Sequence, residues 1–363
     1  DSQATTEPLN LACVGKSFDE RVAGLPDVPE AVMWGRVDRF GGGGVTLGIE
    51  VSVFRAADFH PEACAGVIAE YEMSNVEIED VLACYNDSAL VGVPLAKVVS
   101  IDPDLAVTDG FALKSAGGKA KLGPGELCQT HLDCELGYDC LKHDSAVDAR
   151  ICLKQHGVYA IESVPTNTPL IIRTRSQDPD DPNDWHDSYL WNVIILSDRL
   201  DAKGVQADGS TEQPEKFLGK DSYRMNPTVV GEGQWLLVPS SMGAEEIWEA
   251  NGAIGGRIRD CAVAGGRRGW PIRDARIGLG VPASALAFFN ESEDSAVPVK
   301  TRTSTNIHGR YAAVDIESGP NRIAGAARLA SGEIVSLGSM DVFVIPQALI
   351  IVSLPGVVPV VTK

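Results

Sequence analysis

The densest group of side chains that could bind a ligand is an acidic run in QDPDDPNDWHDSY, residues 177–189. Carboxylate oxygens are the hard ligands that Ca²⁺ prefers. The spacing departs from an EF-hand loop, because the run lacks the central glycine and the closing glutamate. A calcium site and a solvated acidic loop are therefore both open interpretations for the same five carboxylates: Asp178, Asp180, Asp181, Asp184 and Asp187.

Cysteines form a second group of reactive side chains. Four of them lie in the region that begins CQTHLDCELGYDC, separated by five, five and eleven residues. Structural zinc sites use closer pairs, so this spacing and the even total favour disulfides over bound metal or free thiols. Disulfides in turn imply an oxidising compartment. The eight candidates are Cys13, Cys64, Cys84, Cys128, Cys134, Cys140, Cys152 and Cys261.

Signatures of catalysis are missing from the sequence. It contains no HExxH, no GxSxG and no phosphate-binding loop. The segment GLGVPA at 278–283 fits the GxGxxA pattern, but it follows a predicted sandwich strand and lacks the βαβ unit of a dinucleotide site. We therefore predict no catalytic residue and a chain that is not an enzyme. A secreted enzyme of an unrecognised type is the weakest alternative.

The elements that must position these side chains first become visible as a repeat. HGVYAIESVPT at 156–166 and HGRYAAVDIES at 308–318 share their His, Gly, Tyr and Ala at matching places. Gly157 suits a turn with positive φ, and Tyr159 suits a strand whose ring enters the core while its hydroxyl reaches the rim. We interpret the two phrases as the same turn and strand of a duplicated β-sandwich.

The remaining β-rich segments support a duplicated, mainly β fold. In the second copy they are short and separated by turn signals, at 255–261, 272–282, 310–316, 322–329, 332–338 and 347–354. The first copy begins with MWGRVDRF at 33–40 and GIEVSVF at 48–54, but its next strand arrives only after residue 156. We therefore predict two antiparallel β-sandwiches in tandem, the first interrupted by a disulfide-rich insertion.

The domain boundaries follow from this comparison. Six of the eight cysteines fall in the insertion, so Cys13 and Cys261 must pair with each other or stay unpaired if the insertion closes on itself. A short helix is expected at 244–250, with Trp235 and Trp248 as anchors. The predicted parts are a leader or linker over 1–30, a first sandwich over 31–200 with its insertion at about 55–155, a connector over 201–251, and a second sandwich over 252–363.

Composition narrows the class of protein. The chain has 363 residues, 44% of them apolar, and a formal net charge of −19 that opposes binding to nucleic acid and anionic lipid. The apolar run at 342–361 contains three prolines, which favours a final buried strand at 348–354 over a membrane helix. We expect an extracytoplasmic protein, secreted or attached to the outer membrane or cell surface, with membrane contact only through a lipid anchor upstream of Asp1.

A strand that begins GRV or GRI, a second strand and then the phrase G-x-Y-A resemble the carboxypeptidase regulatory-like domains of the transthyretin-like β-sandwich family. The resemblance covers about 33–54 with 156–175, and about 255–355. It implies transthyretin-like or Ig-like sandwiches. With the cysteine-rich insertion and the segment WHDSYLWNV, the chain also resembles cell-envelope lipoproteins of myxobacterial type, which implies an exported, surface-associated protein.

Enzymes on related sandwiches carry motifs that this chain lacks. Hydroxyisourate hydrolases end in Tyr-Arg-Gly-Ser, whereas this chain ends in VVPVVTK. Intradiol dioxygenases hold iron with two tyrosines and two histidines one residue apart, and none of the six histidines here forms such a pair. The resemblance therefore implies a fold without either activity.

Together these observations predict a non-catalytic structural or protein-binding component of the cell envelope. Edge strands must be paired or covered, so a protein partner or self-assembly is expected, and the apolar tail could add a strand to a neighbour through Val357, Val358, Val360 and Val361. The alternative is a carbohydrate- or peptide-binding module with Trp185, Trp191 or Trp270 exposed. Calcium is the one candidate cofactor.

Overall fold

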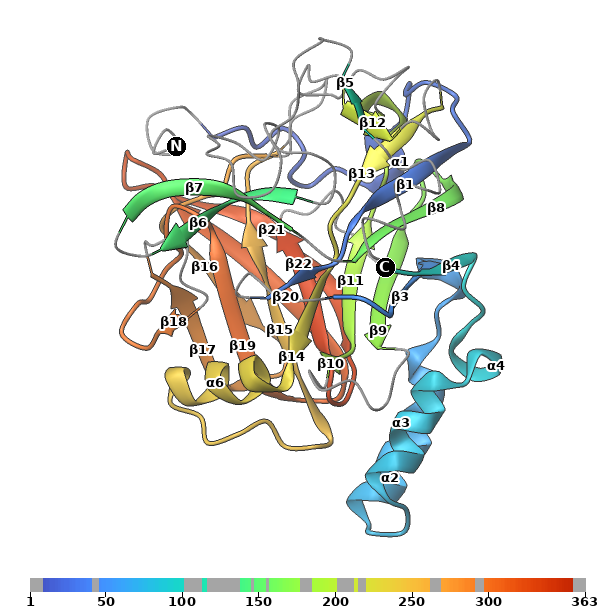
Figure 1. The fold of residues 1–363 in the computed structure, drawn as a ribbon. Helices are drawn as coiled ribbons and strands as arrows, with labels where there is room; N and C mark the ends of the chain where they lie inside the picture. The colour runs from blue at the N-terminus through green and yellow to red at the C-terminus, as the bar shows by residue number, and fades with distance from the viewer. Residues whose placement is uncertain are drawn as a thin grey trace.

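The computed structural model describes residues 9–40, 46–100, 157–176, 185–200, 220–261, 269–290 and 297–354, and the strand backbone at 113–115, 138–144, 147–154 and 212–214. The described chain is mainly β, which confirms the predicted fold class, and its sheets form the body seen in Figure 1. One helical hairpin, α2 and α3, extends beyond the sheets.

Seven strands build the first repeat. They form a three-stranded sheet in the order β13-β1-β8 and one half of a longer sheet in the order β11-β9-β3-β4. Side chains from both sheets meet in one buried core, with Met33 and Ile161 on one side and Val51 and Ile172 on the other. The strands are β1 (Glu30–Arg36), β3 (Ile49–Arg55), β4 (Ala96–Val99), β8 (Val158–Pro165), β9 (Leu170–Ser176), β11 (Ser188–Val193) and β13 (Ser222–Arg224).

The second repeat contains the same strands in the same chain order, except that β17 and β18 stand where the first repeat has β4. One sheet is β16-β20-β21, and the other is the run β18-β17-β19-β15-β22 of the longer sheet. Sequence reasoning missed β17, because its run of alanines has no strong apolar alternation. The strands are β15 (Asn251–Ile258), β16 (Ala275–Leu279), β17 (Ala283–Phe289), β18 (Pro298–Val299), β19 (Arg310–Glu317), β20 (Gly319–Arg328), β21 (Ile334–Val344) and β22 (Leu349–Leu354).

Register shows that the two repeats are the same structural unit. Gly35 on β1 lies opposite Tyr159 on β8, and Gly256 on β15 lies opposite Tyr311 on β19. Each of these strand pairs shifts register at a β-bulge in the corresponding place, between positions 31 and 33 in one and 252 and 254 in the other. The repeated phrase therefore marks equivalent strands, as the sequence predicts.

In each repeat, a tyrosine side chain passes over a glycine on the neighbouring strand and reaches the strand beyond it; we call this arrangement the tyrosine crossing. The hydroxyl of Tyr159 donates to the carbonyl of Met225 at 2.7 Å, and that of Tyr311 donates to the carbonyl of Val352 at 2.9 Å. Both accepting residues belong to the strand on the far side of the glycine-bearing strand, at the end of β13 and in β22. A Cβ on Gly256 would lie 1.6 Å from the carbonyl oxygen of Val352, so only glycine fits there.

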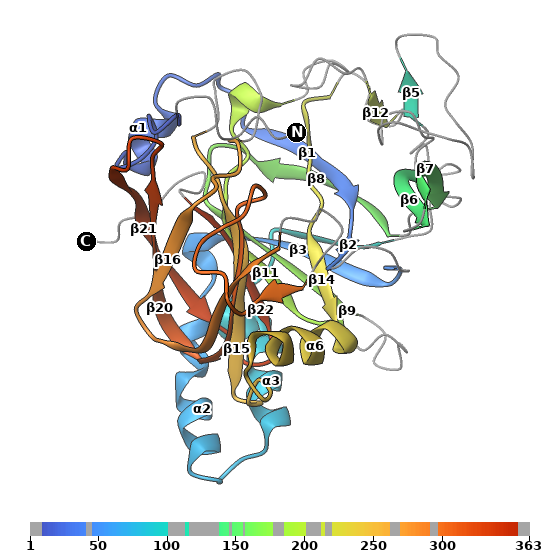
Figure 2. The same ribbon diagram turned by 90° about the vertical axis from the view of Figure 1, so that its left-hand side faces the viewer.

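The two repeats share one sheet rather than forming separate sandwiches. Strand β11 of the first repeat pairs in parallel with β22 of the second, which joins both halves into a nine-stranded sheet. Strands β15 and β22, and β1 and β13, are also parallel, so the pairing is less uniformly antiparallel than the sequence predicts. Figure 2 shows β22, β15 and β11 side by side in the middle of the molecule. We call the contact between β11 and β22 the seam.

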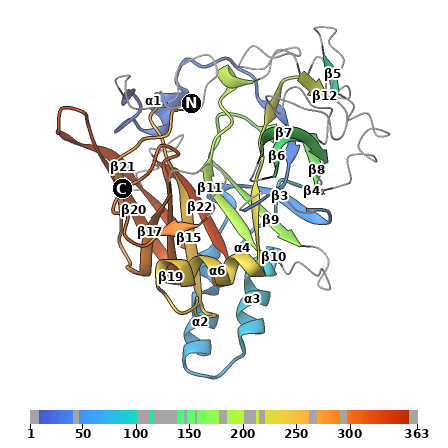
Figure 3. The same cartoon turned by 60° about the vertical axis from the view of Figure 1, so that its left-hand side comes forward.

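The insertion begins with a helical hairpin held by a disulfide. Cys64 at the end of the 3-10 helix η3 (Pro61–Cys64) bonds to Cys84 on α3, and their Cα atoms are 5.9 Å apart. Figure 3 shows α2 and α3 reaching below the sheets. Its helices are α2 (Ala65–Glu72), α3 (Ile78–Asn86) and α4 (Ser88–Val91), and its later strands are β5 (Leu113–Ser115), β6 (Tyr138–Asp144) and β7 (Val147–Lys154).

The connector differs from its prediction. Its helix is α6 (Glu232–Met242), and the expected helix at 244–250 is wrong, because Gly243 takes a left-handed conformation (φ 87°) and ends α6. Trp235 is buried as expected, but Trp248 is 46% exposed. The remaining elements are α1 (Phe18–Val22), β2 (Asp38–Arg39), β10 (Trp185–His186), β12 (Glu212–Pro214), β14 (Thr228–Gly231) and two 3-10 helices, η2 (Ala56–Asp58) and η6 (Ser197–Arg199).

The requirement for glycine at position 256, where the side chain of Tyr311 passes over β15, can be tested by substitution. We expect Gly256→Ala to lower the free energy of unfolding by about 3 kcal/mol, because its Cβ meets a backbone carbonyl that cannot move without parting the strands. Gly278→Ala is the matched control on β16, since its Cβ meets no atom within 4 Å. Urea denaturation with intact disulfides measures both, and equal midpoints would contradict the interpretation.

Candidate functional site

The seam is the place where the two repeats act on each other. Ser188, Tyr189 and Leu190 lie in parallel register with Leu349, Ile350 and Ile351. The amide of Leu349 donates to the carbonyl of Asp187 at 2.9 Å. On its other side β22 pairs with β15 over its full length, so β22 is an inner strand of the shared sheet. The seam therefore buries edges that each sandwich would otherwise expose.

A row of polar and aromatic side chains crosses the first-repeat half of this sheet toward the seam. Lys97 on β4 lies opposite Ser52 on β3, Ser52 lies opposite Arg173 on β9, and Arg173 lies opposite Tyr189 on β11. Residues opposite one another in a sheet share a face. The row continues across the seam to Ile350, which belongs to the buried core of the second repeat.

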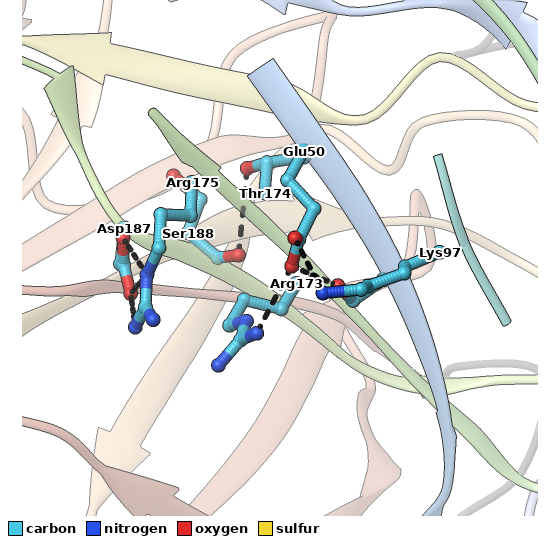
Figure 4. A network of polar contacts seen from close by, with 8 residues as sticks. Glu50, Lys97, Arg173, Thr174, Arg175, Asp187 and Ser188 are labelled. Atoms are coloured by element: carbon cyan, nitrogen blue, oxygen red, sulfur yellow. Dashed lines mark hydrogen bonds and ion pairs between the residues drawn. The ribbon is translucent and has the colours of Figure 1, made fainter. Parts of the chain in front are cut away.

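Glu50 is the centre of the charged part of this face (Figure 4). Its carboxylate lies 3.2 Å from Arg173 Nη2 and 3.3 Å from Lys97 Nζ, and it accepts a hydrogen bond from Ser52 at 2.5 Å. The side chains of Glu50 and Arg173 are 5% and 9% exposed, whereas that of Lys97 is 64% exposed. Burial acts to raise the pKa of Glu50, but the hydrogen bond from Ser52 and the two positive charges outweigh it and hold the pKa below its usual value.

A second ion pair lies beside the first, at the entry to β11. Arg175 Nε lies 3.1 Å from Asp187 Oδ1 and Arg175 Nη2 lies 2.5 Å from Asp187 Oδ2, in the forked geometry typical of arginine and carboxylate. Burial acts to lower the pKa of Arg175, but Asp187 raises it above its usual range. The carboxylate of Asp187 therefore faces a guanidinium, which fixes the residue just before the seam.

An aromatic layer attaches the helical hairpin to the same face. The ring of Phe59 lies 5.2 Å from Phe54 and 5.8 Å from both Tyr189 and Trp191, measured between centroids. Burial raises the pKa of Tyr189 to about 12. The guanidinium of Arg173 lies 5.3 Å from the Phe54 ring centroid, so the charged and aromatic parts of the face touch.

The hairpin also reaches the second repeat. Tyr71 at the end of α2 donates a hydrogen bond to Glu249, and its ring lies 5.9 Å from that of Trp248. The bond to Glu249 is the main reason why the pKa of Tyr71 rises to about 12. The insertion of the first repeat thus contacts the loop before β15, on the other side of the seam.

The predicted cysteines are accounted for in part. Cys13 bonds to Cys261, one of the two outcomes left open by the sequence, with Cα atoms 5.6 Å apart. This bond ties the N-terminal segment to the end of β15. Cys140 and Cys152 lie opposite each other in the backbone register of β6 and β7. Cys128 and Cys134 lie outside the described residues.

Other predicted sites lie mostly beyond the described chain. Of the five candidate calcium ligands only Asp187 is described, and it is paired with Arg175. The four other aspartates lie outside the described residues, as do the tail valines Val357, Val358, Val360 and Val361. Within the part that the structure describes, no three His, Cys, Asp or Glu side chains gather in a way that could hold a metal ion.

The aromatic residues proposed for carbohydrate binding are largely covered. Trp185 is 9% exposed and has the Arg39 guanidinium over its ring at 5.5 Å, while Trp191 packs on Phe59. Trp270 alone of the three is exposed, at 37%. Two of the three residues therefore cannot form an open stacking platform.

Sequence reasoning missed the residues that build the charged face. Glu50, Arg173 and Arg175 lie in strands and belong to no motif, and they come together only through the pairing of β3 with β9. The available signal was a charge at alternate positions of strands whose other positions are Val and Ile, as in IEVSVF and LIIRTR. It indicates a polar sheet face but not the partner of each charge.

Comparison with known proteins does not assign the chain to a family. No family model matches the chain, and no curated protein matches it either. Similar solved structures include the shaft pilin SpaA from Lactobacillus rhamnosus GG, at 8% identity over 91% of this chain and 99% of that one, with a TM-score of 0.17. Another is BcpA, the major pilin subunit of Bacillus cereus, at 11% identity over 67% and 54%, with a TM-score of 0.17. Likeness at these TM-scores carries no argument about this chain.

Two further observations bear on the earlier expectations. The resemblance to carboxypeptidase regulatory-like domains stays a prediction, because no family model supports it. In the described part of the chain no helix is both long and apolar enough to cross a bilayer.

The buried ion pair of Glu50 predicts a pH-dependent stability. Because folding lowers the pKa of Glu50, its contribution is present above the ordinary value of 4.5 and is lost as the pH falls through the lowered value. We expect Glu50→Gln to cost about 3 kcal/mol at pH 7, since Arg173 stays buried without its carboxylate. The variant should also lose less stability than the parent below pH 4.5.

Lys97→Met is the matched control for this pair. Lys97 contacts the same carboxylate from an exposed position, so its loss should cost less than about 1 kcal/mol. Chemical denaturation from neutral to acidic pH measures all three proteins. Equal losses at pH 7 for the two variants would show that burial does not decide the strength of these pairs.

The calcium hypothesis for the acidic run remains testable by heating. If the run binds Ca²⁺, millimolar calcium should raise the melting temperature, because a ligand that binds only the folded state stabilises it. Asp180→Asn with Asp181→Asn should remove the effect, and magnesium at the same concentration serves as the control. A melting temperature that calcium does not change would reject the site.

Proposed function

We propose that this chain is a non-catalytic structural component of the cell envelope that binds protein partners or copies of itself through strand edges and tails. The observation that supports the proposal is the seam, in which two copies of one sandwich join edge to edge through β11 and β22. A unit that extends its sheet by strand pairing within the chain has the shape and polarity needed for the same contact between chains.

The described architecture favours a rigid scaffold. The seam, the aromatic layer and the Tyr71 contact all connect the first repeat to the second, and the Cys13–Cys261 disulfide adds a covalent link from the N-terminal segment. The charged side chains nearest the seam are paired with one another. Such an arrangement suits a load-carrying or spacing role better than chemistry.

The proposed location is outside the cytoplasm. Two disulfides in the described chain are typical of proteins that fold in an oxidising compartment. Attachment to the outer membrane or cell surface through a lipid anchor is the finer part of this proposal. Mass analysis of the protein purified from its native membrane fraction tests that part separately.

Assembly through the tail predicts an effect of shortening the chain. Deletion of Val357–Lys363 should lower the particle mass measured by light scattering, because the apolar tail can no longer add a strand to a neighbour. Deletion of residues 1–7, equal in length and polar, is the control and should leave the mass unchanged. A C-terminally shortened protein that forms particles of the parent mass would exclude the tail from assembly.

A further inference from the structure

We propose that the helical hairpin and the loop before β15 together form a docking surface for a cationic segment of a partner protein, rich in arginine or lysine. The inference rests on the part of the proposed function that concerns protein partners, since it names one surface and the chemistry of the partner that it fits. The surface, which we call the acidic aromatic surface, consists of Tyr71, Glu77, Glu79, Trp248 and Glu249.

Negative charge is concentrated in the two segments that build this surface. Residues 252–363 hold 12 lysines and arginines and 9 aspartates and glutamates, so the excess negative charge of the chain lies entirely within 1–251. Residues 61–92, which include the hairpin, hold seven aspartates and glutamates and neither lysine nor arginine. The loop at 244–249 adds three glutamates, again without lysine or arginine. Such a concentration of one sign of charge attracts a partner of the opposite sign.

The two acidic segments meet at the hydroxyl of Tyr71. Its hydrogen bond to Glu249 contributes most to the rise in the pKa of Tyr71, and the negative charges of Glu249, Glu77 and Glu79 add to it. A carboxylate raises the pKa of a neighbouring group only when it lies close to that group. Carboxylates from the hairpin and from the loop therefore lie around one point. All three glutamates are exposed, so a cation can reach them from solvent.

Trp248 gives the surface an aromatic face. It is 46% exposed, and its ring lies 5.9 Å from that of Tyr71, with 43° between the ring planes. Met73, which follows the last residue of α2, is 64% exposed. The face of an aromatic ring attracts positive charge, and apolar side chains pack on the methylene groups of lysine and arginine. Aromatic, apolar and carboxylate groups at one place therefore suit the whole length of a cationic side chain.

Both parts of the surface are held in place before any partner binds. The amide of Trp248 donates to Asp315 Oδ1 at 3.0 Å, and its carbonyl accepts from the amide of Asn251 at 2.8 Å. On the other side the Cys64–Cys84 disulfide holds the hairpin, which projects from the sheets in Figure 1. A surface fixed in advance loses little conformational entropy on binding, so more of the interaction energy appears as affinity.

The chemistry of the surface selects a cationic segment over other ligands. A neutral sugar can stack on the ring of Trp248, but the surrounding negative charge gives it no further attraction. Acidic polypeptides and nucleic acids are repelled by the same charge. A second copy of this chain brings a net charge of −19, which opposes its approach here. A segment rich in arginine or lysine is the one that gains from both the ring and the carboxylates.

Titration with a short peptide of alternating arginine and glycine tests the aromatic part. Isothermal titration calorimetry of the full chain with its disulfides intact should show binding, and the same peptide with glutamine in place of arginine should not bind. We expect Trp248→Ala to bind about tenfold more weakly, because the ring no longer faces the cation. Trp270→Ala is the matched control, since Trp270 is also exposed, at 37%, but lies near the opposite end of β15.

Neutralising one carboxylate from each segment tests the charged part. Glu79→Gln combined with Glu249→Gln should weaken binding of the arginine peptide about tenfold at low salt, and added sodium chloride should reduce the difference from the parent. Glu30→Gln combined with Glu333→Gln is the matched control, because it removes two exposed carboxylates elsewhere and gives the same net charge. Equal affinities of the two double variants would show that the peptide responds only to the overall charge of the protein, which would overturn the site.

The outcomes separate this inference from the proposed function. If the parent does not bind the arginine peptide, or if Trp248→Ala binds it as tightly as the parent, the docking surface is overturned. Self-assembly is judged separately, by light scattering of the protein shortened at its C-terminus. Cellohexaose is titrated as the neutral probe, and sugar binding that Trp248→Ala removes would reassign the surface to carbohydrate. Unfolding curves verify that the variants fold, and if Trp248→Ala is unfolded, Trp248→Leu keeps an apolar side chain beside Tyr71 and replaces it in each measurement.

Discussion

The parallel hydrogen bonding between β11 and β22 is the constraint on which the rest of the molecule depends. It makes β22, the last described strand, an inner strand bonded to β15 on one side and to β11 on the other. The sheet of the second repeat thus continues into the first, and the core of the second repeat includes Phe54, Ile171 and Tyr189 of the first. We expect pairing between segments so distant in sequence to form late in folding, because the loop must close before the contact stabilises it.

The insertion packs on the part of the sheet that lies next to the seam. Its helical hairpin rests on Phe54, Tyr189 and Trp191, all on the face that leads from the first repeat to the second. Its disulfide holds η3 and α3 together where the hairpin alone would bury little apolar surface. The insertion in the first repeat therefore stabilises the junction between the two repeats. Through Tyr71 it also contacts Glu249, which precedes the first strand of the second repeat.

The sequence predicted features that are encoded within a few residues, and it missed contacts that depend on how distant strands are placed. The phrase around Tyr159 and Tyr311, the interruption of the first copy and the final strand all follow from patterns within a few residues. The seam could not be predicted, because any exposed edge can pair and the choice depends on how two folded units meet. Glu50 and Arg173 were missed for the same reason, since they lie 123 residues apart and meet through register alone.

The repeats differ in the strands that follow β3 and β16, namely β4 in the first repeat and β17 with β18 in the second, and that difference explains the unequal sheets. After β3 the chain returns as β4 beside β3, whereas after β16 it crosses to β17 beside β19. These additional strands extend the shared sheet at its two ends, and leave β13-β1-β8 and β16-β20-β21 with three strands each. The two smaller sheets cover opposite faces of the shared one, offset by the seam, because Val51 and Ile172 face one of them while Tyr189 and Ile350 face the other.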